Sequence, residues 1–429
     1  MKKWFLLFLI SIGAGGFFAL LVALARTPGV AHLLPPELFY HWLIGHVDLA
    51  LIIGFLSFLV SLWHRVFEKN ERLHELIPAG VGAFLIFLSA LLGVGTAVHN
   101  NYVPTVDHPM FFMGVFLFGA GYFLTALRFS KDALRGLTEQ EPLKGVVSIS
   151  VFISLLFPVT LLISFLKTQR GDEVYLYFER LYWLGGHTHQ FVNASLLIAS
   201  WLLLLRSGGA SPPRLARFLN FLLLPFPLIY LLLQVFAQDP IGPQVRTITT
   251  LGYALGIGVP TLIYAFVLLR TSFSQLNFFS GGLVLSILMY VLGAFMGYMI
   301  AGSDLRIPAH YHGVIASILI ALMLLTYRFL IELGYVSRLP KLVRLQPYLY
   351  GIGMLLFTSG LFWAGVYGAP RKTFGTGYIE SLKVYIFMAV MGLGSVLSVM
   401  GGIIFVVFVL YSIIKRHEPG VPKEARQMD

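Results

Sequence analysis

Two histidines separated by one residue, His310 and His312, stand at the start of an apolar run that extends from Gly313 to about Thr326. Ionisable side chains inside a membrane span are costly, so they usually mark a functional site. On a helix of about 3.6 residues per turn, residues two positions apart lie roughly 200° apart around the axis. We therefore expect the two imidazoles to point to nearly opposite sides of one helix. That arrangement suits a helix between two metal centres, each of which takes one axial histidine.

Two further histidines stand at comparable positions in other apolar runs. His46 lies near the start of the run 42–63, and His187 begins the run 186–205. A single histidine at a helix end is commonly a hydrogen-bonded interfacial residue, whereas several that converge on one depth favour metal ligation. His41 is the alternative ligand in the first of these runs. His46 is preferred because it lies deeper and is followed by an uninterrupted apolar stretch.

The elements that must position these histidines are membrane helices. The chain of 429 residues is 58% hydrophobic and 11% charged, with a mean hydropathy of +0.83, which excludes a soluble globular domain. Runs long enough to cross a bilayer as helices, about 20 residues each, recur along the whole chain. The sequence predicts one all-α membrane domain, residues 1–429, with twelve transmembrane helices at 4–25, 42–63, 77–98, 110–128, 146–166, 186–205, 217–236, 248–269, 278–300, 310–331, 346–367 and 385–414.

The positions of the basic residues predict the membrane orientation, and the absence of cysteine limits the kinds of metal site. Most of the 30 Lys and Arg residues lie in the two terminal segments and in alternate loops, and by the positive-inside rule these segments face the cytoplasm. Both termini are then cytoplasmic, and the histidines lie near the outer face. The net charge of +11 is explained by this topology, so no nucleic-acid partner is expected. Because the chain has no cysteine, disulfides, thiolate ligands and cysteine-held iron–sulfur clusters are excluded.

The segment Arg306-Ile-Pro-Ala-His310-Tyr-His312-Gly-Val-Ile resembles the tenth span of subunit I of the haem-copper oxidase superfamily. This superfamily includes cytochrome c oxidases, quinol oxidases and nitric oxide reductases. The resemblance implies a haem-copper oxidase subunit I-like bundle of twelve spans with both termini inside. It also implies that His310 is the axial ligand of a high-spin, ligand-binding haem. His312 and His46 would then be the two axial ligands of a low-spin haem.

Two other segments carry the same resemblance. Trp183-Leu-Gly-Gly-His187-Thr-His189-Gln is similar to the sixth span of the family. Gly368-Ala-Pro-Arg371-Lys372-Thr-Phe is similar to the segment whose basic pair binds the haem propionates. Arg306 is a further candidate for a propionate contact, because a buried carboxylate needs a cationic partner.

The chain departs from the family pattern where the family binds copper. One copper ligand comes from the sixth span, for which His187 stands, and an adjacent His-His pair comes from the end of the seventh. The corresponding position here falls near Val235-Phe236, and no His-His pair occurs in the chain. The tyrosine that one class of oxidases carries in the sixth span is replaced by Phe191, and the glutamate position is His189. The three histidines and one glutamate that nitric oxide reductases need are also missing.

These departures divide the expected site into two halves. His46 and His312 can give bis-imidazole ligation, which suits the transfer of single electrons. His310 remains as a ligand for the second haem, with His187, His189 and Gln234 as a distal pocket or relic metal site. Since one imidazole binds copper weakly, we expect two haems as cofactors and copper to be absent or atypically bound.

Three functions are compatible with the sequence. The first is a haem-binding oxidoreductase subunit that transfers electrons and binds or reduces a small gas, O2 or NO. The second is a di-haem cytochrome that only transfers electrons within a larger respiratory complex. The third is a haem-free membrane transporter with a histidine-lined site. The first two imply a bacterial inner membrane, other respiratory subunits, and a cytochrome c or quinol as electron donor.

Overall fold

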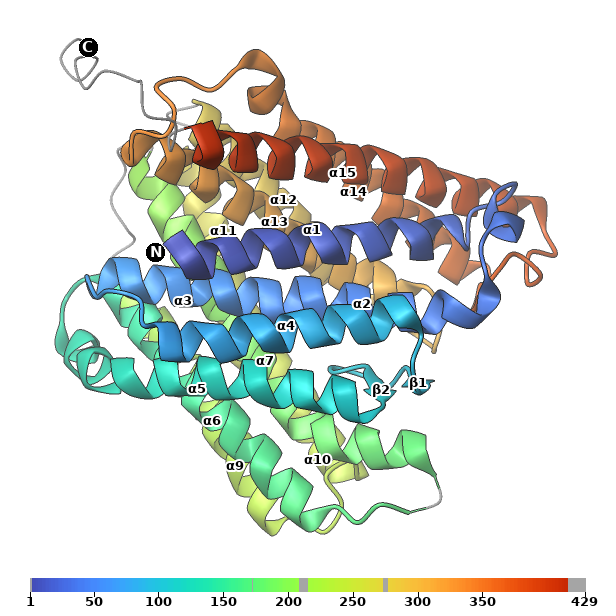
Figure 1. Ribbon diagram of the computed structural model, residues 1–429, viewed down its shortest axis with the longest axis horizontal. Coiled ribbons are helices and arrows are strands. Elements are labelled where there is room, and N and C mark those ends of the chain that lie inside the picture. The colour runs from blue at the N-terminus through green and yellow to red at the C-terminus, as the bar shows by residue number, and fades with distance from the viewer. Residues whose placement is uncertain (1, 172, 208–214, 273–276, 416–429) are drawn as a thin grey trace.

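Long apolar helices that run side by side make up most of the chain (Figure 1). The computed structural model describes residues 2–171, 173–207, 215–272 and 277–415. Within these residues, twelve helical stretches are long and apolar enough to cross a membrane, which confirms the prediction of an all-α, twelve-span membrane protein. The α-helices are α1 (Lys2–Leu24), α2 (Phe39–Val47), α3 (Phe55–Val66), α4 (Leu73–Leu92), α5 (Pro109–Thr138), α6 (Pro142–Lys167), α7 (Val174–Ser207), α8 (Ala216–Phe221), α9 (Pro225–Phe236), α10 (Pro243–Leu251), α11 (Val259–Ser272), α12 (Phe278–Tyr298), α13 (Arg306–Glu332), α14 (Lys341–Val366) and α15 (Leu382–Lys415).

Short elements of other kinds connect or interrupt these helices. They are the 3-10 turns η1 (Ala31–Leu33) and η2 (Pro36–Leu38), the π-helical segments η3 (Asp48–Gly54) and η4 (Gly252–Gly258), and the strands β1 (Thr96–Val98) and β2 (Thr105–Asp107). The two strands pair antiparallel, with Ala97 opposite Val106. We call the end of the bundle that carries this hairpin the hairpin end, and the end at which α1 begins the N-terminal end.

One helix begins well before its predicted start. The sixth span runs from Val174 to Arg206 instead of 186–205, so His187 lies well inside α7 rather than at its beginning. Glu179 and Arg180 lower the hydropathy of this first part without ending the helix. Glu179 accepts hydrogen bonds from the backbone nitrogen of Asn101 (3.0 Å) and from its side-chain nitrogen (2.6 Å), and Arg180 pairs with Asp239 at 3.3 Å. At the hairpin end Glu179 is therefore hydrogen-bonded, and Arg180 is paired with a carboxylate.

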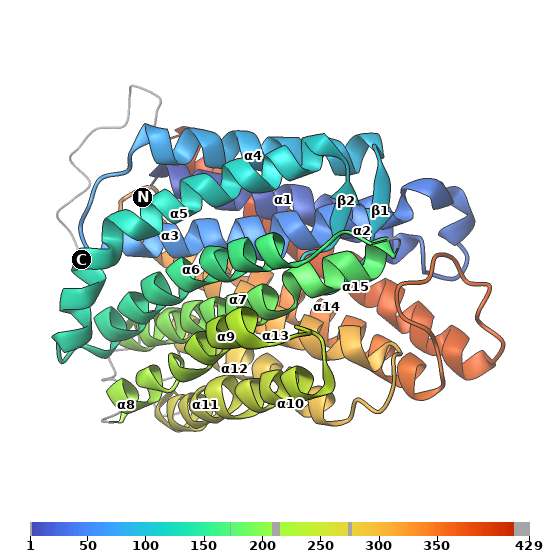
Figure 2. The ribbon, with the colours of Figure 1, turned by 90° about the horizontal axis from the view of Figure 1, so that it is seen from below.

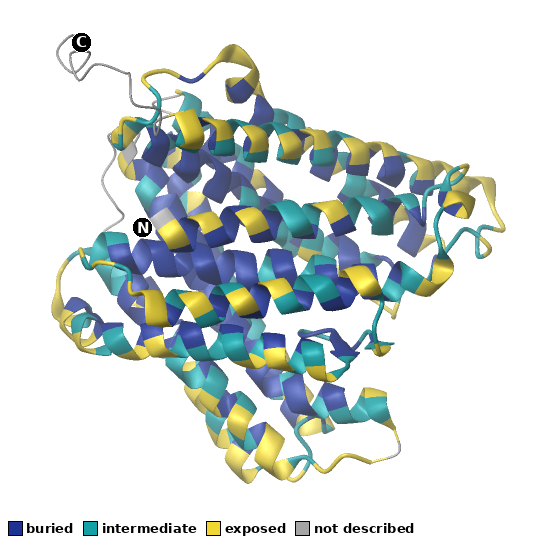
Figure 3. Ribbon diagram, in the orientation of Figure 1, coloured by how far each residue is buried: buried dark blue, intermediate teal, exposed yellow. Residues whose placement is uncertain are grey.

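Burial separates central helices from lipid-facing ones. In an apolar stretch of 18 residues within the span Val174–Arg206, 89% of the residues are buried, whereas in that of Leu382–Lys415 only 28% are, so α7 lies in the centre and α15 on the outside. Exposed residues recur along α1, α4 and α15 (Figure 3), which is the pattern of helices with one face toward lipid. Seen from below, α4 and α5 lie along one edge of the bundle and α11 and α12 along the opposite edge, with α7 and α13 between them (Figure 2).

Glycine allows the first three spans to approach closely. A Cβ added at Gly45 of α2 would lie 2.6 Å from Cβ of Ala90 in α4, and one added at Gly15 of α1 would lie 2.8 Å from Cβ of Ala50 in η3. Real side chains avoid such distances, so both positions require glycine for helix packing. These contacts fix the position of α2, which carries His46.

Candidate functional site

His46 and His312 face one another within the helix bundle. Their ring centroids are 6.3 Å apart and their planes differ by only 8°. At a rise of about 1.5 Å per residue, His46 lies about 10 Å from the start of α2, and His312 lies about 9 Å from the start of α13. Both helices begin at the hairpin end, so the two side chains share one depth. The helices themselves have different neighbours, because α2 packs against α1 and α4 whereas α13 packs against α12, α14 and α7.

Hydrogen bonds fix the tautomer of both rings. Nδ1 of His46 lies 3.1 Å from the carbonyl oxygen of Gly15, and Nδ1 of His312 lies 2.7 Å from that of Pro308. A carbonyl oxygen only accepts, so each Nδ1 carries the proton and donates it. Nε2 of each ring is then unprotonated, which is the form in which histidine binds a metal, with its other nitrogen oriented by a backbone carbonyl.

The spacing of the two rings fits a metal ion held between them. If the two Nε2 atoms faced one metal ion in line, two metal–nitrogen bonds of about 2 Å, with about 1.1 Å from each nitrogen to its ring centre, would separate the centroids by about 6.2 Å. The observed separation of 6.3 Å agrees with this value. Neither His46 nor His312 is fully buried, although both residues lie within the bundle. The donor set, two neutral imidazoles, is that of a low-spin haem.

His41, the alternative ligand in the second span, is placed differently. It is 7% exposed, and its Nε2 lies 3.3 Å from the carbonyl oxygen of Gly95, which directly precedes β1. The described residues provide no second imidazole beside it, whereas His46 has His312.

His310 points away from His312, as two-residue spacing predicts. Its Nδ1 lies 2.7 Å from the carbonyl oxygen of Gly293 in α12, so this ring also has a protonated Nδ1 and a free Nε2. A Cβ added at Gly297 would lie 2.6 Å from the same nitrogen, which shows how closely His310 packs against α12. His312 instead lies against Phe357 of α14, with a centroid distance of 5.0 Å.

His187 has both ring nitrogens engaged. Its Nδ1 lies 2.6 Å from the carbonyl oxygen of Trp183, and its Nε2 lies 2.8 Å from the hydroxyl of Tyr102. Since Nδ1 must donate to the carbonyl, Nε2 accepts the Tyr102 proton. Tyr253 donates in turn to Tyr102 at 3.3 Å and stacks on His187 with a centroid distance of 4.8 Å. Tyr230 of α9 also contacts the ring, at 5.9 Å.

The sequence did not predict these three tyrosines around His187. Tyr102 lies in the loop between β1 and β2, Tyr230 in α9 and Tyr253 in the π-helical segment η4. Glycines make room for them, because a Cβ at Gly186 would lie 2.2 Å from Cβ of Tyr102. Tyrosines of membrane proteins are commonly interfacial anchors, so only their contact with His187 distinguishes them.

The other members of the expected distal site are not brought together. His189 contacts Phe157 of α6, at a centroid distance of 5.4 Å. Gln234 lies at the level of Lys167, which donates to its carbonyl oxygen at 3.0 Å. Phe157 and Lys167 are ten residues apart on α6, or about 15 Å along the helix. Among the described residues there is no group of three or more His, Asp or Glu side chains that could hold a metal ion.

The segment that corresponds to the family's His-His pair faces outward. Val235 is 42% exposed and Phe236 is 78% exposed, at the last residues of α9. Lys167 caps this helix end by donating to the carbonyl oxygens of Val235, at 2.7 Å, and of Gln234. From α9 it is Tyr230, not this pair, that reaches His187.

The three basic residues expected at the haem propionates lie at the hairpin end. Arg371 donates to Oδ1 of Asn101 at 2.8 Å, and Lys372 donates to the carbonyl oxygen of His99. Burial, reinforced by the charge of Arg371, lowers the pKa of Lys372 to about 8. Arg306 is already neutralised by Asp304, at 2.6 Å. Arg371 and Lys372 are therefore the cations that remain available for an anionic group.

A pocket of about 240 Å³ adjoins this pair and is lined by His99, Tyr175, Ser303, Arg371 and Lys372. Arg26, which the sequence analysis did not single out, lies close by: it is 8% exposed and donates to the carbonyl oxygen of Pro370 at 2.7 Å. Tyr311, between the two histidines of α13, interacts electrostatically with both Arg371 and Arg26. The basic group and the histidine motif thus belong to one region.

No family model matches this sequence. An uncharacterized protein of Rickettsia prowazekii (strain Madrid E) is 25% identical over 488 aligned positions, which cover 94% of each chain. An uncharacterized protein of Aquifex aeolicus (strain VF5) is 51% identical over 345 residues, which cover 80% of this chain and 88% of the Aquifex protein. The chain belongs to the same family as this Aquifex protein.

Proposed function

We propose that the chain is a membrane cytochrome in which His46 and His312 hold a low-spin haem. The proposed haem transfers electrons near the hairpin end of the bundle. The observation that supports this proposal is the pair of parallel imidazoles, 6.3 Å apart and with both Nδ1 atoms occupied by carbonyl oxygens. A bound haem supplies one-electron transfer. Gly15 and Pro308 orient the two ligands, and Arg371 and Lys372 supply positive charge for its propionates.

His310 is the proposed ligand of a second haem, since its Nε2 is also free. The state of His187 favours electron transfer over gas chemistry as the function. Its Nε2 already accepts a hydrogen bond from Tyr102, and it lies among three tyrosine rings rather than beside other metal-ligating side chains. Binding or reduction of O2 or NO therefore remains the second candidate.

A pyridine haemochrome assay on the purified protein tests the proposal first. We expect haem in the wild-type protein, and a haem-free preparation from haem-replete cells would favour the transporter hypothesis instead. His46→Ala and His312→Ala should each abolish the low-spin spectrum. His41→Ala and His189→Ala are matched controls and should leave it unchanged. If the low-spin spectrum is lost in the control variants but kept in His46→Ala and His312→Ala, the ligand assignment is refuted.

Two spectroscopic measurements refine the result. Parallel imidazole planes should give a rhombic low-spin ferric signal in electron paramagnetic resonance, whereas a strongly axial signal would contradict the 8° angle between the rings. Carbon monoxide difference spectra separate the two haem functions. Carbon monoxide binding that His310→Ala abolishes would support an accessible second haem and the gas-binding candidate.

A further inference from the structure

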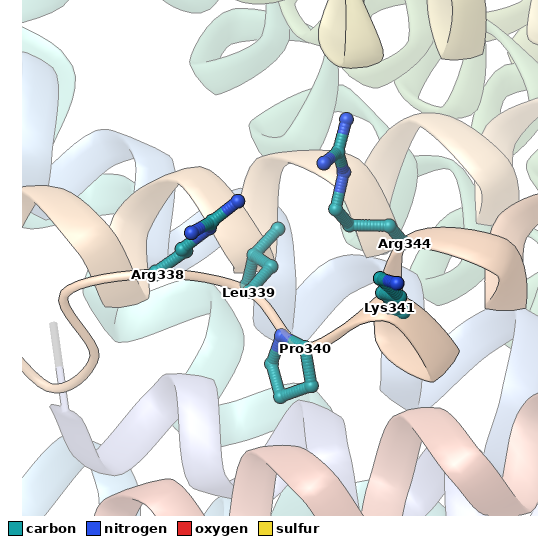
Figure 4. A pocket seen from close by; sticks show the side chains of 5 residues that line it. All are labelled: Arg338, Leu339, Pro340, Lys341 and Arg344. Atoms are coloured by element: carbon teal, nitrogen blue, oxygen red, sulfur yellow. The ribbon is translucent and has the colours of Figure 1, made fainter.

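A second pocket lies at the N-terminal end of the bundle, far from His46, His310 and His312. It has a volume of about 340 Å³ and is lined by Arg338, Leu339, Pro340, Lys341 and Arg344. These residues span the loop after α13 and the first turn of α14. In Figure 4 the side chains of Arg338 and Arg344 extend to the same side of the loop, with Leu339 between them. Lys341 lies beside them at the first residue of the helix.

The charge of this pocket has no compensation within the described part of the chain. Arg338, Lys341 and Arg344 are all exposed, and none of the ion pairs between described residues involves them. The first turn of α14 contains no acidic residue, although the positive end of a helix dipole normally favours one. The guanidinium of Arg344 lies over the ring of Phe278, at 5.9 Å, and not beside a carboxylate. Three cations therefore meet without an anion.

The geometry suits a phosphate group. Guanidinium groups can each donate two parallel hydrogen bonds to phosphate oxygens, and a lysine adds a mobile point charge. The first backbone N–H groups of α14 have no acceptor within the helix, as at any helix N-terminus, and the N–H of Arg344 donates to the carbonyl oxygen of the N-cap residue Pro340, at 3.0 Å. Side-chain donors from the loop and from the first turn of α14 thus line one pocket.

The surroundings of the pocket favour a lipid over a soluble phosphate compound. Leu342 and Leu345, in the same turns of α14, are 60% and 59% exposed. They belong to the membrane span Lys341–Val366, so their exposed surface faces lipid. A soluble anion would use only the cations, whereas a phospholipid would also lay its acyl chains along these leucines. The distribution of Lys and Arg predicts that this end faces the cytoplasmic leaflet, where basic pockets bind anionic head groups.

We propose that this pocket is a binding site for the phosphate head group of an anionic phospholipid, held by Arg338, Lys341 and Arg344. The proposal is independent of the haem. The positive-inside preference explains why basic residues are present, but it does not explain why three of them line one cavity next to exposed leucines. Lys131, Arg135 and Arg270 are also exposed at this end and are not part of the pocket.

The test compares two variants with the same change in charge. Arg338→Gln/Lys341→Gln/Arg344→Gln removes the pocket cations, and Lys131→Gln/Arg135→Gln/Arg270→Gln removes three others from the same end. Each full-length protein, in detergent, is titrated with phosphatidylglycerol and, separately, with phosphatidylcholine. Bound lipid is counted by native mass spectrometry, and the thermal midpoint is recorded. We expect phosphatidylglycerol to bind the wild type and the control variant equally well. In the pocket variants its affinity should fall about fivefold for each pocket cation removed.

Soluble anions distinguish the source of the phosphate. Inorganic phosphate and glycerophosphoglycerol, added at the same concentrations, should neither bind nor raise the thermal midpoint. If they act as well as the lipid, the site recognises free phosphate and the lipid assignment is wrong. If the pocket variant retains phosphatidylglycerol as well as the control variant does, or if phosphatidylcholine binds equally, the pocket is not an anionic lipid site. Single substitutions of each cation provide the same comparison should the triple variant fail to fold.

Discussion

The carbonyl oxygen of Gly15 orients His46, and this contact can be broken without touching either histidine. A Cβ added at Gly15 would lie 2.8 Å from Cβ of Ala50, 2.9 Å from its nitrogen and 3.2 Å from its Cα. Two of these three atoms belong to the backbone, so in Gly15→Ala helix α1 must move away from η3 by several tenths of an ångström. The hydrogen bond from His46, already 3.1 Å long, would then exceed the usual limit.

Two effects follow for Gly15→Ala. Overpacking at a helix contact costs about 1–3 kcal/mol of stability. Loss of the carbonyl that orients a metal-ligating histidine typically lowers metal affinity about 10- to 100-fold. The imidazole also becomes a weaker electron donor when its N–H loses an acceptor, so the midpoint potential of a bound haem should rise. The assays are haem content after gel filtration, redox titration, and the thermal midpoint of the same samples.

The next residue of α1 provides the control. A Cβ added at Gly16 would meet no atom within 4 Å, so Gly16→Ala should retain haem, potential and stability. Ala50→Gly in the Gly15→Ala protein removes the shortest contact and should restore part of the haem content. If Gly15→Ala and Gly16→Ala behave alike, the contact between α1 and η3 does not position His46, and the reasoning is refuted.

Three further predictions concern other parts of the molecule. Arg128→Met should destabilise the fold by about 3–5 kcal/mol, because Glu75 is 1% exposed and would lose Arg128, its close cationic partner at 2.7 Å. Glu75→Gln/Arg128→Met should recover most of this loss, measured by unfolding in detergent. Between pH 8 and 10.5, Lys372 is protonated in the unfolded chain but has lost its proton in the folded chain. The free energy of unfolding should therefore rise with pH over this range, by about 1–3 kcal/mol. Thermal scans should show no such rise in Lys372→Met. Tyr102→Phe should cost about 1–2 kcal/mol, because Nε2 of His187 loses its donor, and an unchanged thermal midpoint would contradict the hydrogen-bond assignment.

The spans could be predicted from sequence because hydropathy is a local property of each helix. The start of α7 could not, since Glu179 and Arg180 look like a loop until their partners are known. Those partners, Asn101 and Asp239, lie in other segments of the chain. Charged residues whose partners are distant in the sequence do not look helical in a sliding hydropathy window.

The equal depth of the histidines predicted that they converge, the family resemblance implied that His46 pairs with His312, and the structure places these two rings 6.3 Å apart. The atoms that orient them were not predicted, because Gly15 and Pro308 act through backbone carbonyls that every residue possesses. Glycine at position 15 is a sequence signal only of close packing. The rotation of α1 about its own axis decides which of its carbonyl oxygens faces the imidazole of His46. Hydropathy does not determine that rotation.

All four histidines of the site are the same residue type, but their hydrogen bonds divide them into two groups. His46, His312 and His310 each donate from Nδ1 to a carbonyl and keep Nε2 free. His187 also donates from Nδ1, but its Nε2 accepts from Tyr102. A metal can bind the first three without displacing any described group, whereas it must displace a hydroxyl to bind His187.

Displacing Tyr102 would disturb more than one hydrogen bond. The residue has a positive φ of 67°, and the neighbouring Asn101 is held on both sides, by Glu179 at 2.6 Å and by Arg371 at 2.8 Å. Removing the Tyr102 hydroxyl from His187 therefore requires the loop between β1 and β2 to leave its contacts with α7 and with the basic segment after α14. The proposed electron transfer at His46 and His312 needs no such rearrangement, but a metal-dependent reaction at His187 would. For this reason the arrangement favours a cytochrome over a gas reductase.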